Sequence, residues 1–168
     1  MKSLKQLLKA LINIRRFFLG QLRKLKLFSF NKNKITIGRN FYCGKDCFVS
    51  SKNIFIIGDN FYMGSYCHLA ANSKIGNDVL LASFVSLVGG DHKIDDINTT
   101  IREAGRDKFK PIEIEDNVWI GHGVIVMHGV KIFSGAVVAA GSVVTKNIPR
   151  DEIWGGVPAK FIRKRKKK

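Results

Sequence analysis

The sequence predicts an all-β protein, a parallel β-helix of about five coils, because apolar residues recur at every sixth position along most of the chain. A period of six matches neither an α-helix, with about 3.6 residues per turn, nor the two-residue alternation of a half-buried strand. It is typical of a solenoid whose flat faces meet at tight turns, and the small residue that usually follows each apolar one suits such a turn. The apolar positions are Ile37, Cys43 and Val49, then Ile57, Met63, Leu69, Ile75, Leu81 and Leu87, then Ile114, Ile120, Val126, Ile132, Val138 and Val144.

Two interruptions break this regular repeat. A two-residue slip occurs near Asn53, and the six-residue rhythm stops altogether from Val88 to Pro111. The second segment is polar, charged and flanked by glycine, so we expect residues 88–111 to loop out of the prism rather than fill it. Long loops in compact repeat folds are usually functional, which makes this loop a candidate place for chemistry.

The two ends of the chain differ from the repeat. In residues 1–27 apolar side chains fall mainly on one side of a helical wheel and basic ones on the other, with no Asp or Glu. Such a helix either lies on an anionic membrane or caps the open end of the β-helix within an oligomer. Beyond Asn147 we expect a turn, a short helix and a basic tail. The chain is therefore divided into an N-terminal helix (1–30), a β-helix domain (31–148) and a C-terminal extension (149–168).

The composition indicates one strongly basic domain. The 168 residues leave little room for a second domain, and 29 Lys and Arg against 13 Asp and Glu give a net charge of +16. Anionic lipid, nucleic acid or a polyanionic ligand such as CoA would suit that charge. Nucleic acid fits least, because Phe17, Phe18, Phe28 and Phe30 sit at helical or hinge positions rather than along a basic groove.

The cysteines indicate a reducing compartment. Cys43, Cys47 and Cys67 are odd in number and lack the paired spacing of a disulfide framework or a zinc site. Neither an uninterrupted apolar span nor a secretory signal is apparent. We therefore expect a cytoplasmic location.

Among the four histidines, His92 is the candidate general base. It follows Gly89, Gly90 and Asp91 in the looped segment, where glycines allow a ligand to approach, and imidazole is the side chain whose unperturbed pKa suits proton removal near neutral pH. The alternative is a solvated loop histidine with no role. A zinc site shared with a neighbouring subunit would need imidazoles converging on one ion at about 2.1 Å.

The last third of the chain carries the most specific motifs, IEDNVWIG at 114–121, GV at 129–130, AAGSVVTKNIP at 139–149 and WGGVPAKFIR at 154–163. These strings closely resemble the hexapeptide-repeat acetyltransferases, and the resemblance covers about residues 31–165. It implies a left-handed β-helix, acetyl-CoA as donor, no metal, and a homotrimer with its active sites between adjacent prisms. Asp91-His92, Ile101-Arg102-Glu103 and Pro111-Ile112 further resemble the sugar O-acetyltransferases of bacterial surface-polysaccharide assembly, relatives of the maltose and galactoside acetyltransferases.

The resemblance also implies roles for individual residues, beginning with His92 as catalytic base. Lys146 and Arg163 can supply charge-assisted contacts to the phosphates of CoA, and small residues let its pantetheine arm lie along the backbone. The implied CoA contacts are Trp119, Gly121, His122, Ala140, Gly141, Thr145, Lys146 and Arg163.

The acceptor side matches the family less well. Galactoside-type relatives place an asparagine about two coils before the histidine, where this sequence has Gly64-Ser65-Tyr66. Tyr66, Asn72 and Ser83 are the candidate acceptor contacts. The acid that orients the imidazole stays open among Asp91, Asp95, Asp96 and Glu103.

Together these observations predict an acetyl-CoA-dependent O-acetyltransferase that acts on a sugar or glycan hydroxyl in capsule, O-antigen or exopolysaccharide biosynthesis. Direct transfer is expected, because Cys43 and Cys67 fall on or beside inward-facing positions and read as small buried hydrophobes. A sugar N-acetyltransferase is the first alternative, and a non-catalytic β-helix protein that binds membrane or nucleic acid is the second. Residues 1–27 would attach the protein to the inner face of the cytoplasmic membrane.

Overall fold

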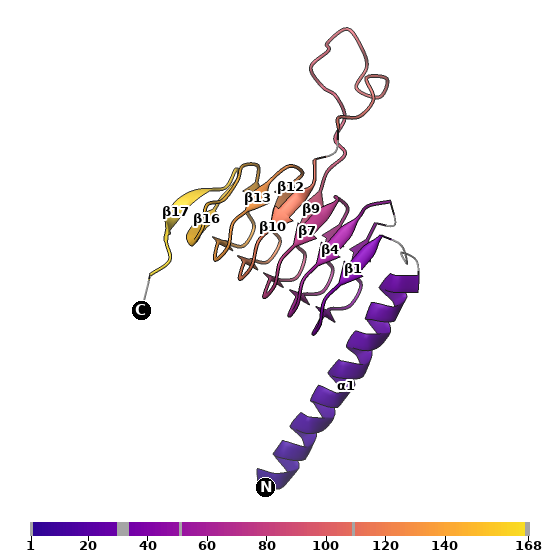
Figure 1. The fold of residues 1–168 in the computed structure, drawn as a ribbon, viewed down its shortest axis with the longest axis vertical. Helices are drawn as coiled ribbons and strands as arrows, with labels where there is room; N and C mark the ends of the chain where they lie inside the picture. The colour runs from indigo at the N-terminus through magenta and orange to yellow at the C-terminus, as the bar shows by residue number, and fades with distance from the viewer. Residues whose placement is uncertain (1, 30–33, 51, 109, 167–168) are drawn as a thin grey trace.

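A computed structural model describes residues 2–29, 34–50, 52–108 and 110–166, and it shows a three-sided prism of short parallel strands with a long helix at one end (Figure 1). Each coil contributes one strand to each of three sheets, and the chain winds as a left-handed parallel β-helix. Five coils are complete and a sixth is begun, as the repeat predicts.

The three sheets are built in the same way. Sheet A contains β1 (Ile35–Ile37), β4 (Phe55–Ile57), β7 (Ser73–Ile75), β10 (Ile112–Ile114) and β13 (Lys131–Ile132). Sheet B contains β2 (Tyr42–Cys43), β5 (Tyr62–Met63), β8 (Leu80–Leu81), β11 (Trp119–Ile120), β14 (Val137–Val138), β16 (Glu152–Gly155) and β17 (Lys160–Lys164). Sheet C contains β3 (Phe48–Val49), β6 (His68–Leu69), β9 (Ser86–Val88), β12 (Ile125–Met127) and β15 (Val143–Val144).

The apolar position of each hexapeptide points into the prism. Met63, Leu69, Leu81 and Leu87 are fully buried in the core. Cys43 is also buried as expected, and its thiol donates to the carbonyl of Gly44. Burying an aliphatic side chain of this kind contributes about 1.5–3 kcal/mol, so the stacked column of such residues is the main source of stability for the prism.

The strand register confirms both interruptions of the repeat. Ile37 pairs with Ile57 and Ile57 with Ile75, so the first coil is two residues longer than the second. β7 pairs directly with β10, although loop 89–111 separates the third coil from the fourth. Figure 1 shows this loop leaving the prism and projecting away from it.

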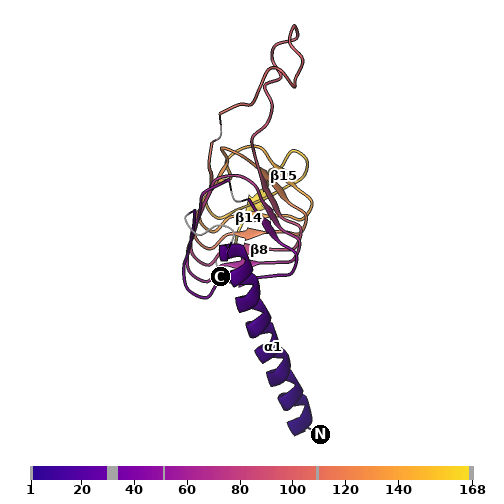
Figure 2. The same cartoon turned by 90° about the vertical axis from the view of Figure 1, so that its right-hand side faces the viewer.

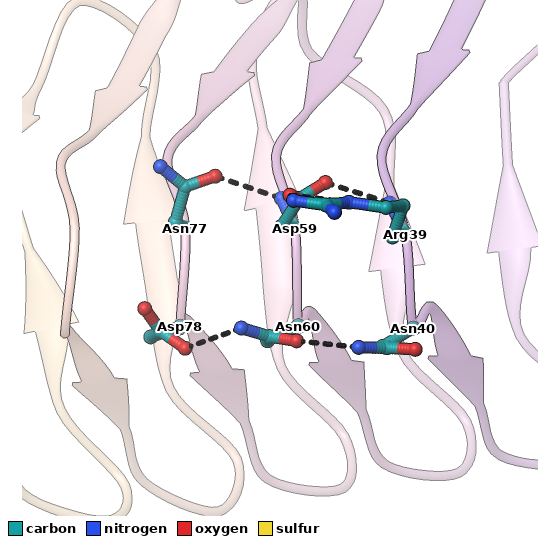
Figure 3. A network of polar contacts seen from close by, with 6 residues as sticks. All are labelled: Arg39, Asn40, Asp59, Asn60, Asn77 and Asp78. Carbon is teal, nitrogen blue, oxygen red and sulfur yellow. Dashed lines mark hydrogen bonds and ion pairs between the residues drawn. The ribbon is translucent and has the colours of Figure 1, made fainter.

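The edge between sheets A and B is closed by a polar ladder (Figure 3). The Arg39 guanidinium pairs with the Asp59 carboxylate at 2.6 Å, and the Asp59 amide donates to Asn77 Oδ1 at 2.8 Å. A second row runs from Asn40 through Asn60, whose amide donates to the Asp78 carboxylate at 2.8 Å. The hydrogen bonds from Arg39 hold the pKa of Asp59 below its ordinary value. The ladder therefore links successive coils through side chains as well as backbone.

The short helix expected after residue 149 is wrong, because the C-terminal extension forms the antiparallel hairpin β16–β17. β16 extends sheet B by pairing with β14, with Ile153 opposite Val137. The open end of a β-helix presents unpaired N–H and C=O groups, and a strand satisfies them where a helix could not. The aromatic residues Trp154 and Phe161 favour a strand, and Gly156 takes a φ of 102° between the two strands.

The predicted N-terminal helix is confirmed as α1 (Lys2–Ser29). It touches the prism at β2, where Arg23 Nη1 donates to the Cys43 carbonyl oxygen at 3.4 Å. The rest of the helix extends away from the coils, which Figure 2 shows from a second direction. No helix in the described part of the chain is long and apolar enough to cross a bilayer.

Candidate active site

The loop between β9 and β10 places the His92 ring beside a backbone carbonyl. The residue is half-buried, and its Nδ1 lies 3.2 Å from the backbone carbonyl oxygen of Ile101. A carbonyl oxygen can only accept, so in a hydrogen bond of this kind Nδ1 carries the proton and Nε2 of the neutral ring keeps a lone pair. His92 also forms a β-bridge with Arg106 across the loop, which orients its backbone. This arrangement suits a general base acting through Nε2.

Three of the four acids considered as partners of His92 have other partners. Asp96 accepts from Thr99 and the Asn98 amide, and these hydrogen bonds lower the pKa of Asp96. Glu103 accepts from the Thr100 hydroxyl at 2.8 Å. Asp91 faces His128 instead of His92. The group that orients the imidazole is thus a backbone carbonyl, a partner that residue types alone could not indicate.

The base of the loop is fastened to the prism by His128, which sequence reasoning left without a role. His128 Nε2 lies 3.4 Å from Asp91 Oδ2, directly before His92 in the chain. Its ring packs beside Gly89 at the edge between sheets C and A, and its Nδ1 is buried with no hydrogen-bond partner in the described structure. Arg106 donates to the Gly90 carbonyl from the returning arm of the loop. These contacts tie both arms of the loop close to residues 89–92.

A second feature is an open groove of about 500 Å³ on the face of sheet B. Trp119, half-exposed, and His122 belong to it, together with Ser83. The predicted donor-side residues Trp119 and His122 and the predicted acceptor-side residue Ser83 are thus brought together. The remaining lining residues are Tyr62, Gly64, Leu80, Leu81 and Ala82.

Several predicted residues lie along the edge between sheets B and C. Ser83, His122 and Ala140 occupy equivalent places on three coils, because the Gly123 amide donates to the Ser83 carbonyl and the Gly141 amide to the His122 carbonyl. Predicted residue Tyr66 lies on the same edge one coil earlier. Its ring stacks on Phe84 at 4.9 Å, and Phe84 in turn meets the His122 ring at 5.2 Å. Phe84 lies at the centre of this aromatic row and was not among the predicted residues.

The backbone beneath this aromatic row is unusual. Tyr66 and Phe84 adopt φ values of 60° and 63°, where the equivalent positions on later coils are glycines. Bulky residues in this left-handed region are uncommon, and each costs about 1–3 kcal/mol. Such strain persists where the surrounding structure fixes it and is concentrated at functional sites. The two aromatic rings therefore mark this edge as a candidate for ligand contact.

Two further predicted residues have identifiable roles in the packing of the prism. Gly121 is buried, and a Cβ there would lie 2.7 Å from the Ala140 amide nitrogen, so the glycine allows the next coil to approach. Asn72 lies at the opposite edge, between sheets C and A, where its Oδ1 accepts from the Ile54 amide at 2.9 Å. Close packing of coils accounts for the first residue, and a turn hydrogen bond for the second.

The last coil and the hairpin form a second, smaller groove of about 220 Å³. It contains predicted residues Thr145 and Lys146, together with Lys160 from β17 and the rings of Trp154 and Phe161. Two cations beside aromatic surface suit a ligand with phosphates and a flat ring. Predicted residue Arg163 lies outside this lining, opposite Ile153, and donates to the Lys164 carbonyl.

One chain alone does not bring His92 and the groove on sheet B together. His92 lies on the loop that leaves the edge between sheets C and A, whereas Trp119 and His122 lie on sheet B and its edge with sheet C. Within the described ranges no group of three or more His, Cys, Asp or Glu side chains could hold a metal ion.

Comparison with known proteins identifies relatives of this fold and these motifs. Residues 111–146 match the family model described as bacterial transferase hexapeptide (six repeats). The galactoside O-acetyltransferase of Escherichia coli K12 is 34% identical over 136 residues, which cover 81% of this chain and 56% of that protein. The chain spans about half the length of the curated relatives it matches.

Solved structures agree with the sequence comparison. A maltose O-acetyltransferase from Clostridium difficile 630 superposes with a TM-score of 0.62 at 33% identity, covering 80% of this chain and 68% of that one. A galactoside acetyltransferase in complex with coenzyme A superposes with a TM-score of 0.60 at 30% identity, covering 85% and 79%.

Proposed function

Because the chain belongs to the hexapeptide-repeat acetyltransferases, we propose that it transfers the acetyl group of acetyl-CoA to a sugar hydroxyl, with His92 as general base. The observation that carries this proposal is the contact of His92 Nδ1 with the Ile101 carbonyl, which favours the tautomer with its proton on Nδ1 and a lone pair on Nε2.

In the proposed reaction His92 Nε2 takes the proton of the acceptor hydroxyl as its oxygen attacks the thioester carbonyl carbon. A tetrahedral oxyanion forms and collapses by breaking the carbon–sulfur bond, which releases CoA thiolate and leaves the acetyl ester on the sugar. The imidazolium then returns its proton to the thiolate. Direct transfer needs no enzyme nucleophile, and Cys43 and Cys67 are buried in the core, away from any acceptor.

The two grooves offer complementary surfaces for acetyl-CoA. We assign the thioester and pantetheine end to the groove with Trp119 and His122, continued by Ala140 and Gly141, where the chain exposes small residues. The phosphate-bearing end would use Lys146 beside Thr145 in the smaller groove, with Arg163 nearby on β17. The net charge of +16 favours a polyanionic donor at any of these positions.

We further propose that the active site is completed by a second copy of the chain. His92 lies on the loop at the C–A edge and Trp119 on the face of sheet B, and a cyclic trimer would set the loop of one protomer against sheet B of its neighbour. The acceptor sugar would then meet the aromatic row of Tyr66 and Phe84 between two prisms. Such a site would exclude more water than an open groove.

For the acceptor we propose a sugar of bacterial surface polysaccharide, acetylated on oxygen in the cytoplasm, where acetyl-CoA is available. The O-acetyltransferase relatives support an oxygen acceptor. The decisive assay measures thiol release from acetyl-CoA across nucleotide sugars, short glycans and matched amino sugars. Release with hydroxyl acceptors supports the proposal, and release only with amino sugars would replace it with N-acetylation.

A complementation experiment tests the shared site. His92→Ala and Trp119→Ala should each be inactive, whereas a trimer assembled from both variants should regain activity at interfaces that pair one intact loop with one intact groove. Random assembly of equal amounts predicts roughly a quarter of the wild-type rate. A mixture as inactive as either parent would show that both residues act within one chain.

A further inference from the structure

Helix α1 exposes an apolar stripe along most of its length. Leu4, Leu7, Leu8 and Leu11 are between 55% and 68% exposed, and Leu22 near the other end is 60% exposed. At about 3.6 residues per turn these positions gather on one side of the helix. Contiguous apolar surface of this kind is rare on a soluble protein without a partner, so the stripe requires an occupant.

The charge of α1 identifies the kind of occupant. The helix contains no Asp or Glu, so every charged side chain in it is a cation: Lys2, Lys5, Lys9, Arg15, Arg16, Arg23, Lys24 and Lys26. Packing the stripes of several copies together would gather these cations without a carboxylate on any helix to pair with them. An anionic bilayer offers hydrocarbon to the leucines and negative headgroups to the cations at once.

We propose that α1 binds peripherally to anionic membranes and lies in the plane of the headgroups with its leucines toward the acyl chains. Its cations are too frequent for it to span a bilayer. Arg15 falls within the apolar stripe, and its long stem allows the guanidinium to reach the headgroups while the methylenes stay apolar. This inference does not depend on the proposed acetyl transfer, because it concerns a surface remote from His92.

The position of α1 on the prism is compatible with this role. Among the described residues, α1 contacts the prism at β2, where Arg23 donates to the Cys43 carbonyl, and Figures 1 and 2 show its N-terminal half standing clear of the strands. In both Figure 1 and Figure 2 the loop with His92 projects in the opposite direction from α1. A membrane bound through α1 therefore contacts a surface remote from this loop, and we expect acetylation of a soluble glycan to proceed equally fast with or without vesicles.

The test mixes the full chain with phosphatidylcholine vesicles prepared with or without phosphatidylglycerol. Flotation then separates the vesicle-bound protein from the free protein. We expect binding only to the anionic vesicles, weakened by salt. Leu7→Gln/Leu11→Gln should lower the partition coefficient at least roughly tenfold, because two leucines no longer enter the interface. Ala10→Gln/Asn13→Gln places the same two glutamines off the stripe and should leave binding within about twofold of wild type. Lys5→Glu/Lys9→Glu should weaken it by about fivefold or more for each charge.

Circular dichroism and the mass of the oligomer in solution show whether each variant keeps the wild-type fold. Failure of the folded full chain to float with anionic vesicles would overturn the proposal. So would flotation unchanged by Leu7→Gln/Leu11→Gln, since the stripe would then have no part in binding. If Leu7→Gln/Leu11→Gln lowered the oligomeric mass in solution but left lipid binding intact, the occupant of the apolar stripe would be a second copy of the chain.

Discussion

Two edges of the same prism place different residue types in the same left-handed backbone conformation. Both the A–B edge and the B–C edge require a left-handed residue on several coils. At the A–B edge the first three such residues are Asn40, Asn60 and Asp78, whose side chains bond to each other from coil to coil (Figure 3). At the B–C edge the first is Asp46 and the last two are Gly123 and Gly141, but Tyr66 and Phe84 lie between them and stack as rings beside the open groove.

The difference separates stability from candidate function. Asn and Asp tolerate the left-handed region and can hydrogen-bond locally, so the A–B edge costs little and adds cross-links between coils. Tyr and Phe tolerate it poorly, and a fold selected for stability alone would not place them there. We therefore propose that Tyr66 and Phe84 have a role outside the folding of the prism.

The largest expected effect concerns the loop. His92→Ala should lower acetyl transfer by about 10²–10⁴-fold, because a general base contributes rate enhancement of that size. The melting temperature should stay unchanged, since His92 lies outside the core. Asp59→Asn at the A–B edge is the matched control and should keep nearly full activity. If CoA release by His92→Ala stays near the wild-type level, another residue is the base.

The next effect is one of stability at the A–B edge. Asn60→Phe places a bulky residue at a φ of 57° and removes two hydrogen bonds of the ladder. We expect a loss of about 2–4 kcal/mol in the free energy of unfolding, measured by urea denaturation, with unchanged activity per folded molecule. An unchanged free energy of unfolding would mean that the backbone tolerates aromatic residues at this angle. The residue types at the two edges would then not indicate different roles.

The reverse exchange at the B–C edge should act on ligand binding. Phe84→Asn introduces the residue type of the ladder at a φ of 63° and removes the ring between Tyr66 and His122. The free energy of unfolding should stay within about 1 kcal/mol, as relief of strain offsets the lost ring contacts. The KM for the acceptor should rise about tenfold, because ring stacking is worth about 1 kcal/mol or more. Equal KM values would remove the aromatic row from the proposed site.

The smallest effect is a pH dependence of the ladder. The pKa of Asp59 is held below its ordinary value by Arg39, so the ionised carboxylate stabilises the folded state above the ordinary pKa. This contribution is lost as the pH falls through the lowered folded-state pKa. Wild type should therefore melt slightly above Asp59→Asn at neutral pH, and the two curves should converge in acid and in high salt. A difference independent of pH would indicate a cause other than charge.

Much of the fold could be predicted because the β-helix is periodic. A side chain that recurs every six residues must face the same core on every coil, so the inward positions, the two-residue slip and the excursion of loop 89–111 followed from spacing alone. The C-terminal hairpin could not be foreseen in the same way. Its conformation depends on the unpaired edge of β14, which exists only once the coils are stacked.

For the candidate site the sequence identifies the chemically suited residues: His92 on a loop, and Trp119, His122 and Lys146 on or beside the repeat. Which of them meet depends on the folded chain. It joined Ser83, His122 and Ala140 along one edge, placed Asn72 on another, and assigned the orientation of His92 to the carbonyl of Ile101. The physical reason is that spacing along the chain defines the face a residue occupies, whereas contacts between coils, and the path of a loop without a repeat, depend on packing in three dimensions.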